Sequence, residues 1–270
     1  MRRLLIIAIV ALAGAPAALA QQPGPMQPPA PPTIKRIPLH PEVPPPPLAP
    51  EEIIQRFTVN EASYKDAFAK FGYLQTIEVE ERGTGGAPSG DYTVKAAVYL
   101  KPDGERYERI LSRSNSTLQY LHLSGQDLEV LASMPLFPLA GDAVAKYKFE
   151  YRGTEKLDEL MTYVFRVEPK TIETGQPLFS GLIWVDNEDL AIVKSYGQFL
   201  TGLPKTDTSL PFSFFETYRE NTEGKYWFPT YIRSDDVVTK SDVDIPIRLI
   251  IRSTDFHLGQ PALPAKSGSD

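Results

Sequence analysis

The chain contains no cysteine and only three histidines among its 270 residues. Without cysteine it has no disulfide, no thiolate metal site and no cysteine nucleophile, so its folded part must be held together by its hydrophobic core. His40, His122 and His257 are too far apart in sequence for any two to form a metal-binding pair on one helix or strand. We therefore expect no metal site built on these residue types.

Motifs that mark common active sites are also missing. The sequence has no Gly-x-Ser-x-Gly elbow and no Ser-x-x-Lys pair. The run at 83–86, Gly-Thr-Gly-Gly, has no Gly-Lys-Ser/Thr ending and no helix expected after it, which indicates a hairpin loop rather than a phosphate-binding loop. Because no set of titratable groups converges, the sequence predicts no catalytic residue, no cofactor and no enzyme activity.

Two groups of carboxylates could gather oxygen ligands around calcium. They lie at 186–189, which reads Asp-Asn-Glu-Asp, and at 235–244. The first falls between two expected strands, where Asp and Asn are favoured for backbone reasons, and neither has the spacing of a calcium-binding loop. Solvated loops are the preferred interpretation, and no metal site is predicted.

Basic residues are fewer than acidic residues. The chain has 28 basic and 34 acidic residues, a net charge of −6, which becomes −8 when Arg2 and Arg3 are left out. A mild acidic excess favours solubility and argues against phosphate backbones as partners. Nucleic acid is therefore not an expected partner.

The amino terminus has the three parts of an export signal. Residues 1–3 are cationic at Arg2 and Arg3, residues 4–13 are apolar, and Ala18-Leu19-Ala20 supplies small residues for a peptidase. The rival interpretation, a membrane anchor, requires about 20 apolar residues. We expect cleavage after Ala20 and no membrane span afterwards. No cysteine follows to carry a lipid, so the sequence predicts a periplasmic or secreted protein of a bacterium-like cell.

Residues 21–49 form a proline-rich tether. Of the 26 prolines in the chain, 13 lie between positions 22 and 50. Such a segment is expected to be disordered and largely polyproline II. A plain spacer is the preferred interpretation over a proline-rich ligand for a partner. Residues 259–270 are expected to form a second disordered segment.

The folded domain is expected at 50–258. Pro50, Glu51 and Glu52 suit the start of a helix over 50–71, either continuous or divided at Asn60, and a short helix is expected at 126–134. Period-two patterns predict strands at 72–82, 92–101, 106–113, 144–154, 160–168, 178–186, 190–199, 213–221, 225–238 and 245–257.

The strand patterns also indicate which faces are covered. At 163–168 apolar and charged residues alternate, as in a strand with one wet face, whereas 178–185 is apolar on both faces and needs shelter from a helix. The fold class is therefore α+β and mainly β: a curved antiparallel sheet, or half-barrel, of about ten strands covered by the first helix and the short second helix.

Large apolar side chains are abundant in the strands. They fill a core or line a cavity for an apolar ligand, and the sequence alone leaves both interpretations open. The candidates for lining such a cavity are Phe165, Ile183, Trp184, Phe199, Tyr218, Trp227, Tyr231, Leu249 and Ile251.

One stretch resembles a known family. Residues 181–194, GLIWVDNEDLAIVK, are similar to the strand-turn-strand signature of periplasmic outer-membrane lipoprotein-sorting proteins, the LolA/LolB-like group. The segments YRGT at 151–154, YVFRVEPK at 163–170 and KYWFPT at 225–230 are similar in kind. The resemblance covers most of residues 50–257, and its motifs are moderately specific because they encode strands and turns.

This resemblance implies a helix-covered half-barrel whose apolar hollow takes up acyl chains of a lipoprotein or another lipid. It also implies an arginine that latches the lid, although no residue here is matched to that role. Two hypotheses follow: a lipid or lipoprotein carrier of the periplasm, and an envelope module with a filled core that binds another protein through a sheet edge.

Overall fold

The computed structural model describes residues 44–83, 86–101, 105–204, 210–240 and 242–259. The predicted signal peptide, nearly all of the proline-rich tether and the carboxyl-terminal segment from residue 260 lie outside the described residues. Predictions about export and disorder therefore stay predictions.

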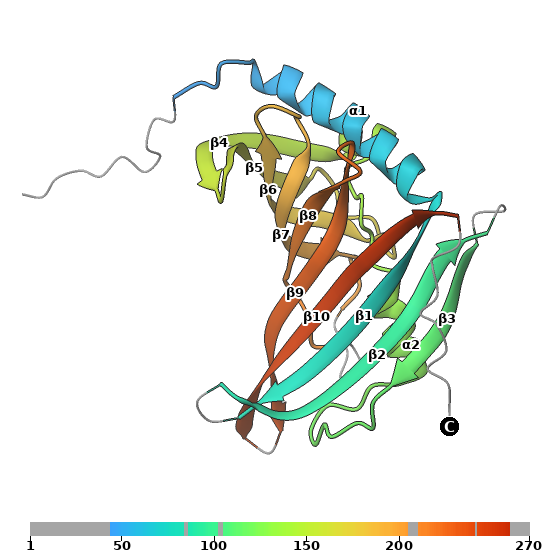
Figure 1. Ribbon diagram of the computed structural model, residues 1–270. Coiled ribbons are helices and arrows are strands. Elements are labelled where there is room, and N and C mark those ends of the chain that lie inside the picture. Colours follow the sequence, from blue (N-terminus) through green and yellow to red (C-terminus); the bar gives the residue numbers. More distant parts are fainter. Residues whose placement is uncertain (1–43, 84–85, 102–104, 205–209, 241, 260–270) are drawn as a thin grey trace, which may run out of the picture. The chain divides into compact units, whose positions relative to one another are not determined.

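Ten antiparallel strands form one open sheet (Figure 1), in the order β3-β2-β1-β10-β9-β8-β7-β6-β5-β4. Consecutive strands pair, except β3 and β4, which form the two edges of the sheet, and the first and last strands, β1 and β10, pair with each other inside it. The prediction of a helix-covered half-barrel of ten strands is confirmed. The strands are β1 (Phe71–Arg82), β2 (Pro88–Leu100), β3 (Arg106–Arg113), β4 (Tyr147–Leu157), β5 (Leu160–Pro169), β6 (Leu178–Asp186), β7 (Ile192–Leu200), β8 (Phe215–Thr222), β9 (Tyr226–Lys240) and β10 (Val243–Leu258).

The first helix, α1 (Pro50–Phe68), is continuous. Pro50 stands in its first turn with Glu51 and Glu52, as the sequence predicts. Asn60 does not divide it. The Asn60 side chain instead donates hydrogen bonds to the backbone oxygens of Asp189 and Leu190, which fix α1 to the turn between β6 and β7.

The second helix, α2 (Gly125–Ala132), begins at a capping box in which Ser124 and Asp127 bond each other's backbone N–H groups. A 3₁₀ helix, η1 (Gly141–Lys146), occupies the start of the strand expected at 144–154, so β4 begins three residues later than predicted. Among the described residues, no helix combines the length and apolar character required to cross a bilayer.

Both helices pack on the same face of the sheet. Ile53 and Phe57 of α1 enter a core cluster with Phe165 of β5 and Ile183 of β6. Leu131 of α2 is buried in a second cluster with β1 and β10. We call the helix-covered side of the sheet the inner face. The helix α1 thus shelters the inner face of residues 178–185, whereas Leu182 and Trp184 pack in a separate cluster with Val164 and Val193.

The strand register defines the two faces residue by residue. One row on the inner face crosses eight strands, and the neighbouring row on the outer face carries aromatic and cationic side chains. The inner row is Phe165, Ile183, Ser195, Thr217, Ile232, Ile251, Ile77 and Val94. The outer row includes Val164, Trp184, Lys194, Tyr218, Tyr231 and Arg252.

The sheet is weakest between β7 and β8. These strands pair only over 194–197 and 215–218, whereas β6 and β7 pair from Leu178 to Val185. Beyond Gly197 the two strands separate. Gly181 and Gly197 face each other across β6 and β7, where an added Cβ on either would lie closer than 3.0 Å to backbone atoms of the other strand.

A buried carboxylate holds the segment that leads into α2. Glu81, at the end of β1, is fully buried and accepts hydrogen bonds from the backbone N–H groups of Gln119, Tyr120 and Leu121 at 2.7–2.9 Å. Three donors of this kind compensate the desolvation of an ionised group. The segment therefore lies at a fixed position on the inner face.

Candidate ligand-binding site

Two adjoining hollows open on the inner face where β7 and β8 separate. The larger, which we call the groove, has a volume of about 390 Å³. Pockets of about 300–1,000 Å³ with mostly apolar walls are typical of small-molecule sites. The groove is lined by Val130, Leu131, Ser133, Met134, Pro135, Pro177, Gln198, Phe199, Thr201, Leu210, Phe212, Ser213 and Phe215.

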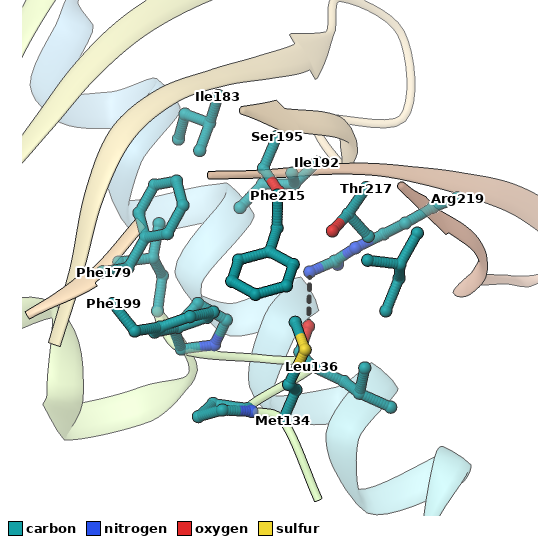
Figure 2. Close-up of a pocket in the computed structure, with 14 residues that line it drawn as sticks. Met134, Leu136, Phe179, Ile183, Ile192, Ser195, Phe199, Phe215, Thr217 and Arg219 are labelled. Carbon is teal, nitrogen blue, oxygen red and sulfur yellow. Dashed lines mark hydrogen bonds between the residues drawn. The ribbon is translucent and has the colours of Figure 1, made fainter. Parts of the chain in front are cut away.

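The smaller hollow, the inner cavity, has a volume of about 20 Å³, enough for about one water molecule. Figure 2 shows it between the sheet and the segment that follows α2. Four residues, Met134, Pro135, Phe199 and Phe215, line both the inner cavity and the groove, so they form the wall between the two spaces. The remaining walls of the inner cavity are Leu136, Pro138, Leu139, Phe179, Ile183, Ile192, Ser195, Thr217, Arg219 and Ile232.

Arg219 of β8 closes one side of the inner cavity. It forms a buried ion pair with Glu61 of α1, in which two guanidinium nitrogens donate to the two carboxylate oxygens, the Nη2–Oε2 distance being 3.0 Å. Nη2 also donates to the backbone oxygen of Leu136 at 3.0 Å, the dashed line in Figure 2. The guanidinium lies 4.8 Å from the centre of the Phe137 ring. One side chain thus joins α1, β8 and the segment at 133–140.

Burial dominates the electrostatics of this ion pair. Glu61 is 0% exposed and Arg219 is 7% exposed. Desolvation raises the pKa of the Glu61 carboxyl, and the charge and hydrogen bonds of Arg219 oppose that rise. The two-point geometry is that of a carboxylate facing a guanidinium. Nearby, burial together with Asp189 and Glu61 raises the pKa of Tyr64 to about 12.

A third hollow lies between α1 and the turn that joins β6 to β7. It is wider, at about 630 Å³, but its walls are mainly polar. Glu52, Arg56, Asn60, Glu188 and Asp189 contribute to them, and Val59 is the main exposed apolar side chain. This composition does not suit an apolar ligand, so the groove and the inner cavity form the candidate site.

Two of the nine residues predicted to line a cavity meet at these hollows. Phe199 lines both spaces, and Ile183 lines the inner cavity. Phe165, Leu249 and Ile251 point to the same face but are buried in core clusters, Phe165 beneath α1 and the other two beneath α2.

The other four predicted residues do not line the groove or the inner cavity. Trp184, Tyr218 and Tyr231 belong to the outer row, with the Lys194 ammonium 4.8 Å from the ring centres of both Trp184 and Tyr218. The Trp227 indole donates to Asp189 at 2.9 Å. Period-two alternation shows that these side chains share a face, but it does not show which face the helices cover.

The carboxylates considered for calcium have other roles. The Asp186 carboxylate accepts hydrogen bonds from the backbone N–H groups of Glu188 and Asp189 and so closes the turn. Asp235 pairs with Arg233 and Arg248. Within the described ranges, no three His, Asp or Glu side chains gather in a way that could hold a metal ion.

Sequence reasoning missed the groups that give this site its polarity. Arg219, Ser195 and Thr217 occupy inward positions of β7 and β8. The signal for them is in the strand 215–221, Phe-Glu-Thr-Tyr-Arg-Glu-Asn, where polar residues occupy both sets of alternating positions. Such a strand does not show which set is buried. The walls from Met134 to Leu139 come from an irregular segment that has no periodic signal.

Comparisons with known proteins do not assign the chain to a family. No family model matches it, and no curated protein sequence matches it. Among solved structures, it is similar to a DUF1329 family protein from Desulfovibrio piger, with 15% identity, a TM-score of 0.33 and coverage of 82% of this chain and 95% of that one.

It is also similar to a putative outer membrane lipoprotein-sorting protein domain from Vibrio parahaemolyticus, with 10% identity, a TM-score of 0.34 and coverage of 82% and 94%. MucB, in a complex with MucA, is 12% identical with a TM-score of 0.24 and coverage of 75% and 94%. The resemblance expected from the sequence is therefore among the similarities found. At these scores they assign no ligand or partner.

Proposed function

We propose that this chain is a non-enzymatic binding protein that holds an acyl chain of a lipid or lipoprotein in the groove. The observation that carries the proposal is the groove itself, about 390 Å³ in volume and walled mainly by leucine, methionine, proline, valine and phenylalanine. Apolar walls of this kind favour a hydrocarbon chain because burying it removes apolar surface from water. Export by a cleaved signal would place this activity in the periplasm, as a carrier of outer-membrane lipids.

The test is ligand binding with a matched pair of variants. Val130 and Val59 are both exposed helical valines, 53% and 64% respectively, but only Val130 lines the groove. Val130→Glu places a carboxylate at the groove wall and is expected to weaken binding of a fluorescent fatty acid by about tenfold or more. Val59→Glu, in the polar hollow, is expected to bind like the original chain.

Lipid extraction of the purified protein provides a second readout. A bound acyl chain would be recovered by organic extraction and identified by mass spectrometry. If the protein carries no lipid and the fluorescent fatty acid does not bind, the proposal is wrong.

The second candidate is an envelope protein-interaction or sensor module. The observation in its favour is the small size of the inner cavity, since most of the inner face is filled by the clusters beneath α1 and α2. A pull-down from envelope extracts, with the Val130→Glu variant as control, distinguishes the two. A specific protein partner together with an absence of lipid binding would favour the second candidate.

A further inference from the structure

Two hydroxyl groups interrupt the apolar row on the inner face. Ser195 of β7 and Thr217 of β8 lie directly opposite each other, with Ile183 on one side and Ile232 on the other. Both line the inner cavity, and Figure 2 shows them beside Arg219. Among the described residues, no group forms a hydrogen bond to either hydroxyl. Both residues are half-buried, so a ligand that displaces water from their hydroxyls has to replace the lost hydrogen bonds.

The cavity walls contain these two hydroxyls but carry no net charge. Among the described residues that form its walls, Arg219 is the only charged one, and both of its Nη groups are bonded to the Glu61 carboxylate. The pair is neutral as a whole. A ligand carboxylate placed here would be a third buried charge facing a guanidinium that is already neutralised, and an unpaired buried charge is strongly disfavoured.

The position of the cavity relates it to the groove. The two spaces share Met134, Pro135, Phe199 and Phe215, so a chain lying in the groove ends against the wall of the cavity. Met134 is unbranched and has three rotatable side-chain bonds, which lets it shift to admit the end of a chain. A space of about 20 Å³ suits one oxygen-sized group.

We propose that the inner cavity is the polar end of the groove and binds an uncharged hydroxyl at the end of a long-chain ligand, with Ser195 and Thr217 as its hydrogen-bond partners. This inference rests on the proposed function and names its ligand class: single-chain neutral amphiphiles of the long-chain alcohol type. Such a ligand lies with its hydroxyl inward, and a fatty acid anion does not occupy the same position.

The experiment measures displacement of a fluorescent fatty acid by dodecan-1-ol and by dodecanoate at pH 8, with the full chain. The expected result is tighter binding of the alcohol. The double variant Ser195→Ala/Thr217→Val is expected to bind the alcohol about three- to tenfold more weakly, because it lacks the hydrogen bonds, and to bind dodecanoate unchanged. The matched control is Ser112→Ala/Thr76→Val, which removes two hydroxyls from the outer face and should change neither affinity.

The outcomes separate the two proposals. If the alcohol and the acid both bind but the double variant binds the alcohol as tightly as the original chain, the hydroxyl site is wrong and the groove proposal stands. If neither ligand nor the fluorescent fatty acid binds, the groove proposal fails as well. If the double variant does not fold, the single variant Ser195→Ala replaces it. Weaker binding of the alcohol by this variant, together with tighter binding of the alcohol than of the acid by the original chain, then supports the hydroxyl site, and the absence of both effects contradicts it.

Discussion

Arg219 and Glu61, separated by 158 positions in the sequence, form a buried two-point ion pair between β8 and α1. Removing one partner leaves the other charge buried without compensation, at a cost of about 3–5 kcal/mol. We therefore expect Glu61→Ala and Arg219→Ala each to lower the free energy of unfolding, measured by urea denaturation, by about that amount. The double variant Glu61→Leu/Arg219→Met should recover part of the loss, because apolar side chains can replace a buried pair.

An exposed ion pair provides the control for this prediction. Glu52 and Arg56 pair on the surface of α1, where they are 41% and 55% exposed. Glu52→Ala should change the free energy of unfolding by about 0.5 kcal/mol or less. Equal losses for Glu52→Ala and Glu61→Ala would show that the buried pair has no special role.

A second prediction concerns the close approach of β6 and β7. Gly181→Ala places a methyl group against the Tyr196 carbonyl and the Gly197 backbone, and neither can move without disturbing the ladder. We expect a loss of about 1–3 kcal/mol. Gly125→Ala is the matched control, because Gly125 begins α2 and an added Cβ meets nothing within 4 Å. It should be neutral or stabilising by up to about 1 kcal/mol.

Glu81 gives a third prediction, measured by hydrogen exchange. Glu81→Gln replaces an acceptor-only group by an amide, which cannot accept all three N–H groups of residues 119–121. The affected amides should exchange faster, and stability should fall by about 1–3 kcal/mol. Glu78→Gln, on the outer face of the same strand, should leave their exchange unchanged. Equal protection in both variants would contradict the anchoring role.

The fourth prediction is a pH dependence. Burial would raise the pKa of the Asp235 carboxyl, but Arg248 and Arg233 outweigh it and hold the pKa below 3.8. Because the folded-state pKa is lowered, the stabilisation by Asp235 is present above pH 3.8 and is lost as the pH falls through the folded-state pKa. Arg248→Gln should raise the pKa in an NMR titration. Arg166→Gln, which lies in a different ion pair, should not.

The sequence predicts the ten strands and two helices well because each is encoded locally. Alternation specifies strands such as 160–168, and Pro50, Glu51 and Glu52 specify the start of α1. Several bounds differ: β2 begins at Pro88 and not at 92, α1 ends at Phe68 and not at 71, and residues 144–146 continue a 3₁₀ turn before β4 begins. A short turn and an extended strand differ little in apolar pattern over three residues.

The site was predictable only in part. Ile183 and Phe199 were predicted correctly because the cavity walls, like the core, are built from large apolar side chains on the inner face. Trp184 and Tyr218 were misplaced because the outer row of this sheet is also aromatic. Arg219 acquires its role from Glu61 and Leu136, which lie 158 and 83 positions away in the sequence, and sequence spacing carries no information about those contacts. Ser195 and Thr217 become part of a cavity wall only because residues 134–139 lie over them.

The short pairing of β7 with β8 has a mechanical consequence. Every other junction in the sheet is a longer ladder, so bending of the two halves against each other concentrates at 194–197 and 215–218. The groove lies beside this seam, at the point where the strands part. Widening it therefore strains few backbone hydrogen bonds between these strands, and the two halves stay joined by α1, which packs on β5 and β6 and holds β8 through the Glu61–Arg219 ion pair.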